Sequence, residues 1–404
     1  MLKNISMTLL VMVIGMLSSF FVTIILGQTL TFSDFGEFVL LKQIILIGSS
    51  IAIFGLDFSY IKVFSNNSDA GKKIHLITII ILSLISISFV LMLYIFYGFQ
   101  LYKSLFIFWC ICFGAINLYQ AAIYRLKDQF LIAQLFSEGW KVALLLLIGV
   151  VLFSGMTIDL QLVYQIFTVS LLFSSSFIIK YFFKTHNVND RDTNYRNYLT
   201  LGLVFWLINS TGLISGGIDK LVVPIIYDSE VLGIFTGVSF IFVISLTMIG
   251  SAIGYVIFPK ISAGNEINIT KLSFAIFFIT LFAIIIFHIT GMELVSIVFK
   301  GKFDNFIDHK IIFCFTLLGS FQIVHIILHF ILSAKGNKKQ LIYYWILSIF
   351  FIGMFISLLY VLKTYFPFSL LSLSIIILIT RFTKIIFMIF LLKRINVDEK
   401  YSII

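Results

Sequence analysis

Long, unbroken apolar runs separated by short polar segments extend along the whole 404-residue chain. A helix needs about 20 apolar residues to cross a bilayer, whereas the strands of a membrane barrel alternate apolar and polar residues over about ten. Runs such as 74–98 and 131–153 fit the helix and not the strand. The pattern therefore predicts an all-α integral membrane protein with twelve spans, near residues 7–27, 36–56, 74–98, 104–124, 131–153, 159–183, 198–217, 231–257, 270–290, 311–334, 340–362 and 366–392.

The longest polar stretch between predicted spans is residues 184–197, which carries both charge signs and four asparagines. Its composition predicts a cytoplasmic linker. The linker divides the chain into an N-terminal lobe of six helices, residues 1–183, and a C-terminal lobe of six helices, residues 198–404.

The two halves show a faint internal repeat. At an offset of 197 residues, the segment 27–65 aligns with 224–262, so that Gly36 falls on Gly233 and Phe38 on Phe235. Because each half has an even number of spans, the repeats share one orientation. Parallel repeats of this kind place a substrate site between the halves, near the middle of the membrane.

Composition and charge agree with this architecture. Hydrophobic residues make up 60% of the chain and charged residues 11%, against about 25% charged in a typical soluble domain. Segments on one side of the predicted spans hold 18 Lys and Arg residues and those on the other side hold 6, which predicts that both termini are cytoplasmic. The net charge of +10 thus reflects topology and attraction to anionic headgroups, not a nucleic-acid partner.

Three stretches carry a resemblance to a known family. They are residues 26–64, with Leu-Gly, a short loop, Phe-Gly-x-aromatic and a later Gly-Leu; residues 216–237, with an Asp-Lys pair and Leu-Gly-x-aromatic; and the Phe-Pro of residues 258–259. The chain resembles the O-antigen flippase, or polysaccharide-transporter, branch of the MATE-like multidrug/oligosaccharidyl-lipid/polysaccharide exporter superfamily. The resemblance covers the full length, but a phenylalanine, Phe38 or Phe235, stands where the family commonly has tyrosine.

The resemblance implies a flippase in the bacterial cytoplasmic (inner) membrane. Its cargo would be an oligosaccharide repeat unit on an isoprenoid diphosphate, carried by alternating access through a cavity between two six-helix lobes. The implied partners are this lipid-linked oligosaccharide, membrane lipids, and a polysaccharide polymerase with its chain-length proteins. Nothing in the sequence indicates a cofactor, a metal site or a catalytic residue.

Ionisable side chains inside spans are costly, so they mark candidate sites. A basic cavity would suit a diphosphate, because Arg and Lys both bind phosphate oxygens. The candidate substrate contacts are Lys42, Lys141, Lys220, Arg381 and Lys384. Salt bridges or snorkelling to an interface are the alternative roles for these cations. Two acids, Glu138 and Asp57, are the candidate sites for a coupling ion, although Glu138 also lies three residues from Lys141, at salt-bridge spacing.

Two other functions stay open. A drug or cation antiporter of the same fold would carry acidic residues deep in the first lobe, whereas the surplus inside these spans is basic. A membrane polysaccharide polymerase would need a large outer loop, and an acyltransferase a catalytic motif; the longest predicted outer loop spans only residues 291–310. His325 and His329 share one helix face, but no third ligand accompanies them, so a polar stripe is favoured over a metal site.

Overall fold

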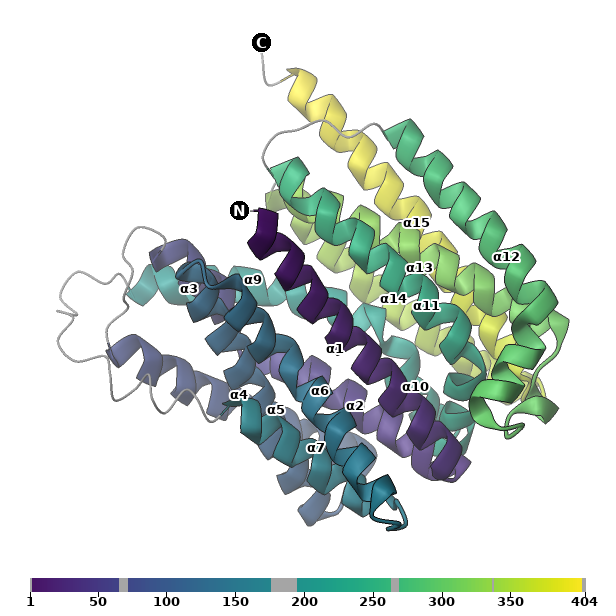
Figure 1. Cartoon of the computed structure of the whole chain (residues 1–404). Helices are drawn as coiled ribbons and strands as arrows, with labels where there is room; N and C mark the ends of the chain where they lie inside the picture. The colour runs from purple at the N-terminus through teal and green to yellow at the C-terminus, as the bar shows by residue number, and fades with distance from the viewer. Residues whose placement is uncertain (1, 65–71, 176–194, 263–268, 336–337, 402–404) are drawn as a thin grey trace. The chain divides into compact units, whose positions relative to one another are not determined.

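The computed structural model describes residues 2–64, 72–175, 195–262, 269–335 and 338–401 (Figure 1). The described chain is helical and contains no strand, as predicted. Its elements are α1 (Leu2–Thr29), α2 (Phe32–Ala52), α3 (Leu56–Phe64), α4 (Lys72–Tyr97), α5 (Leu101–Leu126), α6 (Phe130–Phe153), α7 (Leu160–Ser175), α9 (Tyr195–Gly216), α10 (Ile218–Ile226), α11 (Ser229–Ser262), α12 (Ile269–Phe299), the 3₁₀ turn η2 (Asp304–Phe306), α13 (His309–Lys335), α14 (Lys338–Tyr365) and α15 (Leu370–Tyr401).

Eleven stretches of the described chain are long and apolar enough to cross a membrane. They correspond to eleven of the twelve predicted spans. The remaining one begins as the apolar helix α7, and its predicted continuation to residue 183 lies outside the described residues. The chain is a multi-pass membrane protein.

The chain forms two compact units. Unit 1 comprises residues 1–31 and 38–214, and unit 2 comprises residues 32–37 and 215–404. In unit 1, α5 packs against α3, α4, α6 and α7, and α1 packs against α6. In unit 2, α13 packs against α11, α12 and α15, and α14 packs against α10 and α15. The predicted linker, 184–197, lies outside the described residues up to residue 194, so a lobe boundary there stays a prediction.

Helix α9 belongs to unit 1 because specific hydrogen bonds hold it there. The Tyr198 hydroxyl bonds to the Thr78 hydroxyl at 2.8 Å, and the Ser59 hydroxyl donates to the Tyr198 carbonyl at 2.6 Å. Eight residues further along α9, Trp206 Nε1 donates to the Ile51 carbonyl at 3.0 Å. Helix α9 is therefore fixed to α2, α3 and α4, although it follows the predicted linker.

The second predicted span is broken. Helix α2 ends at Ala52 and α3 begins at Leu56, and between them Phe54 and Gly55 have φ values of 55° and 65°. A side chain at Gly55 would overlap the carbonyl oxygen of Gly202 on α9, so this position needs glycine for both its backbone angle and its close packing. The predicted end at residue 56 falls at this break, and the helical path continues to Phe64.

The internal repeat is visible in the elements and their packing. Helices α2 and α4 begin 197 residues before α11 and α12, whereas α5 and α6 begin 208 residues before α13 and α14. Equivalent helices make equivalent pairs: α4 with α5 and α12 with α13, α5 with α7 and α13 with α15, α6 with α7 and α14 with α15. The second half therefore repeats the first, with eleven residues added before α13.

The two motif glycines of the repeat touch each other within unit 2. A Cβ at Gly36 would overlap the carbonyl oxygen of Ser229, and a Cβ at Gly233 would overlap the carbonyl oxygen of Phe32. At the repeat offset Phe32 corresponds to Ser229, so the contact is reciprocal. The first turns of α2 and α11 thus meet backbone to backbone, which is how small residues allow helices to approach in membranes.

Aromatic residues at the end of α12 and between α12 and α13, where the second half is longer than the first, pack beside this crossing. The Phe303 ring is fully buried and lies 5.3 Å from the Phe32 ring and 4.9 Å from the Phe299 ring, between centroids. Lys302 places its Nζ 5.1 Å from the centre of the Phe32 ring. Because Gly237 has no side chain, it leaves room for the Phe303 ring against α11. The first turn of α2 is therefore held by both α11 and the segment between α12 and α13.

Candidate functional site

The first polar cluster lies wholly in unit 1, where polar side chains of α2 and α6 pack against a stripe of small residues on α1. Gly15, Ser19 and Thr23 are four residues apart, so they share one face of α1. Lys42 of α2 donates to the Ser19 hydroxyl at 2.8 Å and to the Thr23 hydroxyl at 3.2 Å. Its ammonium is thereby held against α1, inside a span, by two neutral oxygens.

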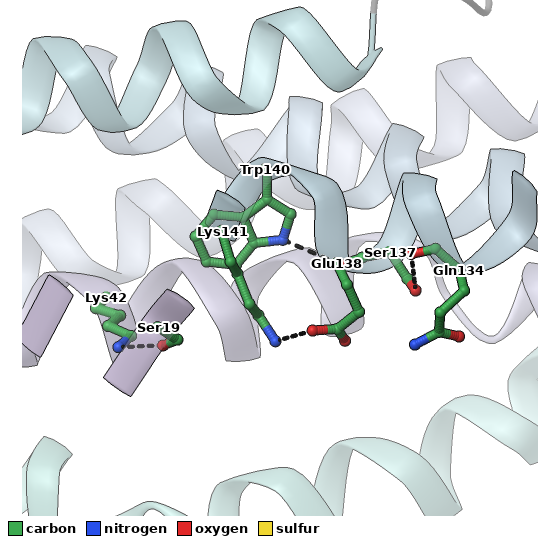
Figure 2. A network of polar contacts seen from close by, with 7 residues as sticks. All are labelled: Ser19, Lys42, Gln134, Ser137, Glu138, Trp140 and Lys141. Atoms are coloured by element: carbon green, nitrogen blue, oxygen red, sulfur yellow. Dashed lines mark hydrogen bonds and ion pairs between the residues drawn. The ribbon is translucent and has the colours of Figure 1, made fainter. Parts of the chain in front are cut away.

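An ion pair of α6 lies on the same stripe. Lys141 Nζ and Glu138 Oε2 are 2.5 Å apart, and their side chains are 19% and 16% exposed. Glu138 can approach α1 because Gly15 carries no side chain: a Cβ there would lie 2.8 Å from both Cβ and Oε2 of Glu138. In the view of Figure 2 the polar ends of Lys42, Lys141 and Glu138 follow one another in a row. Trp140 beside them turns its ring nitrogen to the Ser137 carbonyl at 3.1 Å.

A cavity of about 580 Å³ opens beside this cluster. Helices α1, α5, α6 and α7 line it with mostly apolar side chains, and Glu138 is the one ionisable carboxyl group in the lining. Its volume falls in the range of about 300–1,000 Å³ that is typical of small-molecule sites. The cavity can therefore receive an apolar or amphipathic group next to the ion pair.

Arg381 of α15 is the centre of the second cluster, in unit 2. Its guanidinium donates to the Gln322 amide oxygen and, at 3.0 Å, to the Gly216 carbonyl, and it lies 3.8 Å from an Asp219 carboxylate oxygen. The Gly216 carbonyl is accessible because the helix is interrupted between α9 and α10. Arg381 therefore joins α15, α13 and the broken helix through three different oxygens.

Lys384 extends this cluster deeper into unit 2. It lies one turn after Arg381, is only 5% exposed, and places its Nζ 5.4 Å from the centre of the Tyr344 ring. His325 and His329 of α13 lie close enough to feel its charge. A cavity of about 30 Å³ adjoins Asp219, His325, Arg381 and Lys384. This space holds about two water molecules and is too small for a diphosphate.

The sequence matches no family model and no curated protein. Solved structures match along almost the whole chain. A lipid II flippase, MurJ, in an inward closed conformation, matches with a TM-score of 0.70 at 14% identity, over 96% of this chain and 87% of MurJ. A multidrug resistance transporter of the MATE family, inward-facing, matches with a TM-score of 0.62 at 15% identity, over 96% of each chain.

The chain has the MATE-like fold. A third match with this fold is a transporter of the MOP superfamily from Pyrococcus furiosus, described as having a binding pocket of reverse polarity that suggests a different function. Its TM-score is 0.59 at 16% identity, over 98% of this chain and 94% of that one. The MATE-like fold predicted from the sequence is thus confirmed, and the superfamily and its O-antigen branch belong to the proposal below.

On this MATE-like fold, the five predicted cations separate into two groups. Lys42 and Lys141 lie on the α1 stripe of unit 1, and Lys220, Arg381 and Lys384 lie in unit 2. Lys220 does not line the small cavity, although Asp219 and Arg381 both act on its charge. The structure therefore gathers the predicted residues into one cluster in each unit, and their contact with a substrate stays a prediction.

The two predicted acids have different surroundings. Glu138 forms the ion pair that its spacing from Lys141 allows. Asp57 lies in the first turn of α3, where one carboxylate oxygen is buried and has no hydrogen-bond partner among the described residues. The coupling role of either acid stays a prediction.

Sequence reasoning missed several members of these clusters. Gly15, Ser19 and Thr23 carry no charge, and only their i, i+4, i+8 spacing could have pointed to a helix face. Gln322 was equally inconspicuous among the apolar residues of α13. Asp219 adjoins Lys220 in the chain, but its ion pair is with Arg381, which is distant in sequence.

Proposed function

We propose that the protein is a flippase. It moves isoprenoid-diphosphate-linked oligosaccharide repeat units, destined for O-antigen, capsule or exopolysaccharide, from the cytoplasmic to the outer face of the bacterial cytoplasmic membrane by alternating access. Both termini lie in the cytoplasm in this proposal. A polysaccharide polymerase and its chain-length proteins act on the delivered repeat units.

The observation that carries the proposal is the charge inside a MATE-like fold. The two polar clusters hold or adjoin five cations, Lys42, Lys141, Lys220, Arg381 and Lys384, but only two carboxylates, those of Glu138 and Asp219. A positive interior favours an anionic cargo, and the match to a protein described as a lipid II flippase supports a lipid-linked one.

Lys42 is the residue best placed to meet a phosphate in unit 1. Lys42 donates to the neutral hydroxyls of Ser19 and Thr23, whereas Lys141 forms an ion pair with Glu138. Phosphate oxygens are stronger acceptors than hydroxyls, so a diphosphate can replace these two hydrogen bonds. Arg381 and Lys384 are proposed contacts only for a conformation in which the small cavity of unit 2 is wider.

The test uses a strain from which the gene is deleted. Its isoprenoid lipids are extracted, and the side of the membrane that holds diphosphate-linked repeat units is determined with a membrane-impermeant glycan-labelling reagent. Complete repeat units trapped on the cytoplasmic face, with loss of surface polysaccharide, are expected. Repeat units on the outer face would overturn the proposal in favour of a polymerase.

Complementation then tests Lys42. Lys42→Met is expected to reduce surface polysaccharide at least tenfold, because one charge-assisted phosphate contact contributes about 1.5–3 kcal/mol. Lys42→Arg should retain most export, and Lys310→Met, at an exposed position at the start of α13, is the matched control. Each variant is compared at equal amounts in the membrane by immunoblot. Normal export by Lys42→Met would remove this residue from the substrate path.

One observation favours a second function, a drug or lipophilic-cation antiporter of the same fold. The cavity of about 580 Å³ in unit 1 combines an apolar lining with the Glu138 carboxylate, a suitable environment for a lipophilic cation. Unchanged polysaccharide in the deletion strain, together with increased sensitivity to cationic drugs that Glu138→Gln fails to restore, would select this function.

A further inference from the structure

The cavity of about 580 Å³ in unit 1 follows one face of α6. Five of its lining residues are spaced three or four apart on that helix, so they share this face: Ile132, Leu135, Gly139, Val142 and Leu146. Helix α1 adds Val11 and Ile14 to the lining, and α7 adds Phe173. Both α1 and α7 pack against α6. We call the space lined by these eight residues the α6 groove.

The α6 groove is long and open along one side. Leu135, Leu146 and Phe173 are 47%, 64% and 68% exposed, so the groove is not an enclosed void. From residue 132 to residue 146 the helix rises about 21 Å, at about 1.5 Å per residue. The hydrocarbon core of a bilayer is about 30 Å thick. The groove is therefore long enough to follow more than half of that depth.

The polar groups at the edge of the groove are satisfied by the protein. The Glu138 carboxylate lies 2.5 Å from Lys141 Nζ. The Ser174 hydroxyl accepts a hydrogen bond from the Asn117 amide at 2.5 Å and donates to a carbonyl of its own helix at 3.0 Å. Apolar cavities whose polar groups need no further partner stay dry. The groove therefore suits a hydrocarbon chain and not a polar ligand.

Gly139 leaves a recess in the floor of the groove. A Cβ at this position would meet nothing within 4 Å, whereas Leu135 and Val142 on the same face carry larger side chains. An isoprenoid chain has a methyl branch on every unit, and such a branch can enter the recess. A linear acyl chain would leave the recess empty and would lose the dispersion contacts there. The shape of the floor favours the branched chain.

The groove adjoins the residue proposed above as a phosphate contact. Ile14 in the groove lies five residues, or about 7.5 Å along α1, from Ser19, whose hydroxyl accepts a hydrogen bond from Lys42. In the view of Figure 2, Lys42, Lys141 and Glu138 form a row, and Glu138 borders the groove. A chain that starts from a phosphate at Lys42 can therefore enter the groove directly.

The depth of Lys42 distinguishes a transported lipid from an ordinary one. Lys42 lies ten residues, or about 15 Å, from either end of α2. The phosphate of a bilayer phospholipid stays in the headgroup region, outside the hydrocarbon core. The diphosphate of a lipid in transit passes through that core. A chain in the groove whose phosphate lies at Lys42 thus belongs to a cargo.

We propose that the α6 groove binds the isoprenoid chain of the cargo while its diphosphate lies at Lys42. This inference rests on the proposed function, because it takes an isoprenoid diphosphate as the cargo. Van der Waals contacts along α6 hold the chain. Unit 1 then binds the lipid part of the cargo without any contact to sugar, so the oligosaccharide can vary while both of these contacts stay the same.

The first test uses the unaltered full-length protein in nanodiscs and needs no variant. The probe is a synthetic tetraprenyl diphosphate that carries a photoreactive diazirine in its chain, and labelled residues are identified by peptide mass spectrometry. Label in the α6 groove is expected, with competition by unlabelled tetraprenyl diphosphate and none by phosphatidylglycerol. Label spread evenly over lipid-facing helices would overturn the proposal. Equal competition by phosphatidylglycerol would also overturn it, because the groove would then take the chains of ordinary membrane lipids.

A substitution that fills the recess locates the chain. Gly139→Leu and its matched control, Gly149→Leu, both lie on α6, and a Cβ at either position meets nothing within 4 Å. Gly149 is not part of the groove lining. Gly139→Leu should reduce labelling of the groove by about tenfold, as expected when a side chain displaces about two methylene groups of the bound chain. Gly149→Leu should label in full. Full labelling of a Gly139→Leu protein that melts like the unaltered one would contradict the proposal.

Failure of this proposal and failure of the flippase proposal give different results. Gly139→Leu is expected to reduce surface polysaccharide in the complementation assay, and Gly149→Leu is expected to restore it. Normal export by Gly139→Leu, with repeat units trapped in the deletion strain, would overturn the groove and keep the flippase. Unchanged polysaccharide in the deletion strain would overturn both, even if the groove is labelled, because the labelled chain would then belong to no cargo of this kind.

Discussion

The backbone contact between Gly36 and Gly233 makes a quantitative prediction. Alanine at either position puts a Cβ onto a carbonyl oxygen of the opposing helix turn, Ser229 for Gly36→Ala and Phe32 for Gly233→Ala. Backbone atoms cannot turn away as a side chain can, so the helices must separate. Overpacking of this kind costs about 1–3 kcal/mol. For a unit of about 200 residues, this corresponds to a fall in melting temperature of between about 2 and 12 °C.

The reciprocity of the contact gives a sharper prediction for the double variant. Once the helices have moved apart to admit one Cβ, the second needs little further movement. The Gly36→Ala/Gly233→Ala variant should therefore lose clearly less stability than the sum of the two single losses, because the two positions share one clash.

The assay is thermal unfolding of the purified variants in detergent, followed by tryptophan fluorescence. Gly353→Ala is the matched control, since a Cβ there meets nothing within 4 Å and alanine is favoured over glycine inside a helix. It should leave the melting temperature equal or slightly higher. Two results would refute the contact. The first is a single variant with the melting temperature of the unaltered protein, and the second is a double variant whose loss of stability equals the sum of the two single losses.

Two further predictions follow from buried polar pairs in unit 1. Tyr198→Phe removes the hydroxyl that bonds to the Thr78 hydroxyl and should lower the free energy of unfolding by about 0.6–1.7 kcal/mol, as measured for hydrogen bonds between membrane helices. Tyr343→Phe, at an exposed position, is the control and should leave it unchanged. Equal melting temperatures for the two variants would contradict the role given to Tyr198. Lys141→Met leaves the Glu138 carboxylate without its cation. In the same unfolding assay it should lower the melting temperature more than the double variant Glu138→Gln/Lys141→Met does, because an unbalanced buried charge costs more free energy than the loss of the whole pair. The reverse order would show that Glu138 has another cation beside it.

Features with a one-dimensional signature were predictable. The spans follow from apolar length alone, and the repeat from a few residues such as Gly36 and Gly233. The ion pair of Glu138 and Lys141 follows from their position on one helix. In each case the residues that define the feature lie on a single helix or at a fixed offset along the chain, so their separation in the sequence is enough to predict it.

Features that depend on packing between distant helices were not predictable. The break before α3 depends on Phe54 at a positive φ, which its residue type does not favour, although Gly55 beside it was a signal. Helix α9 joins unit 1 through Tyr198 and Trp206, whose partners lie more than a hundred residues away. The ion pair of Asp219 with Arg381 was not predictable either, because residue spacing along one helix does not identify a contact between two helices.

The reciprocal meeting of Gly36 and Gly233 also bears on the history of the chain. Equivalent residues contact each other in this way where two identical subunits meet across a twofold axis. The crossing of α2 and α11 therefore has the form expected of an ancestral homodimer whose two copies were fused by gene duplication. Each glycine faces the other's backbone, so a side chain at either position would disturb both halves of this contact. The extra length before α13, by contrast, occurs in one half only, so the surroundings of the two glycines differ.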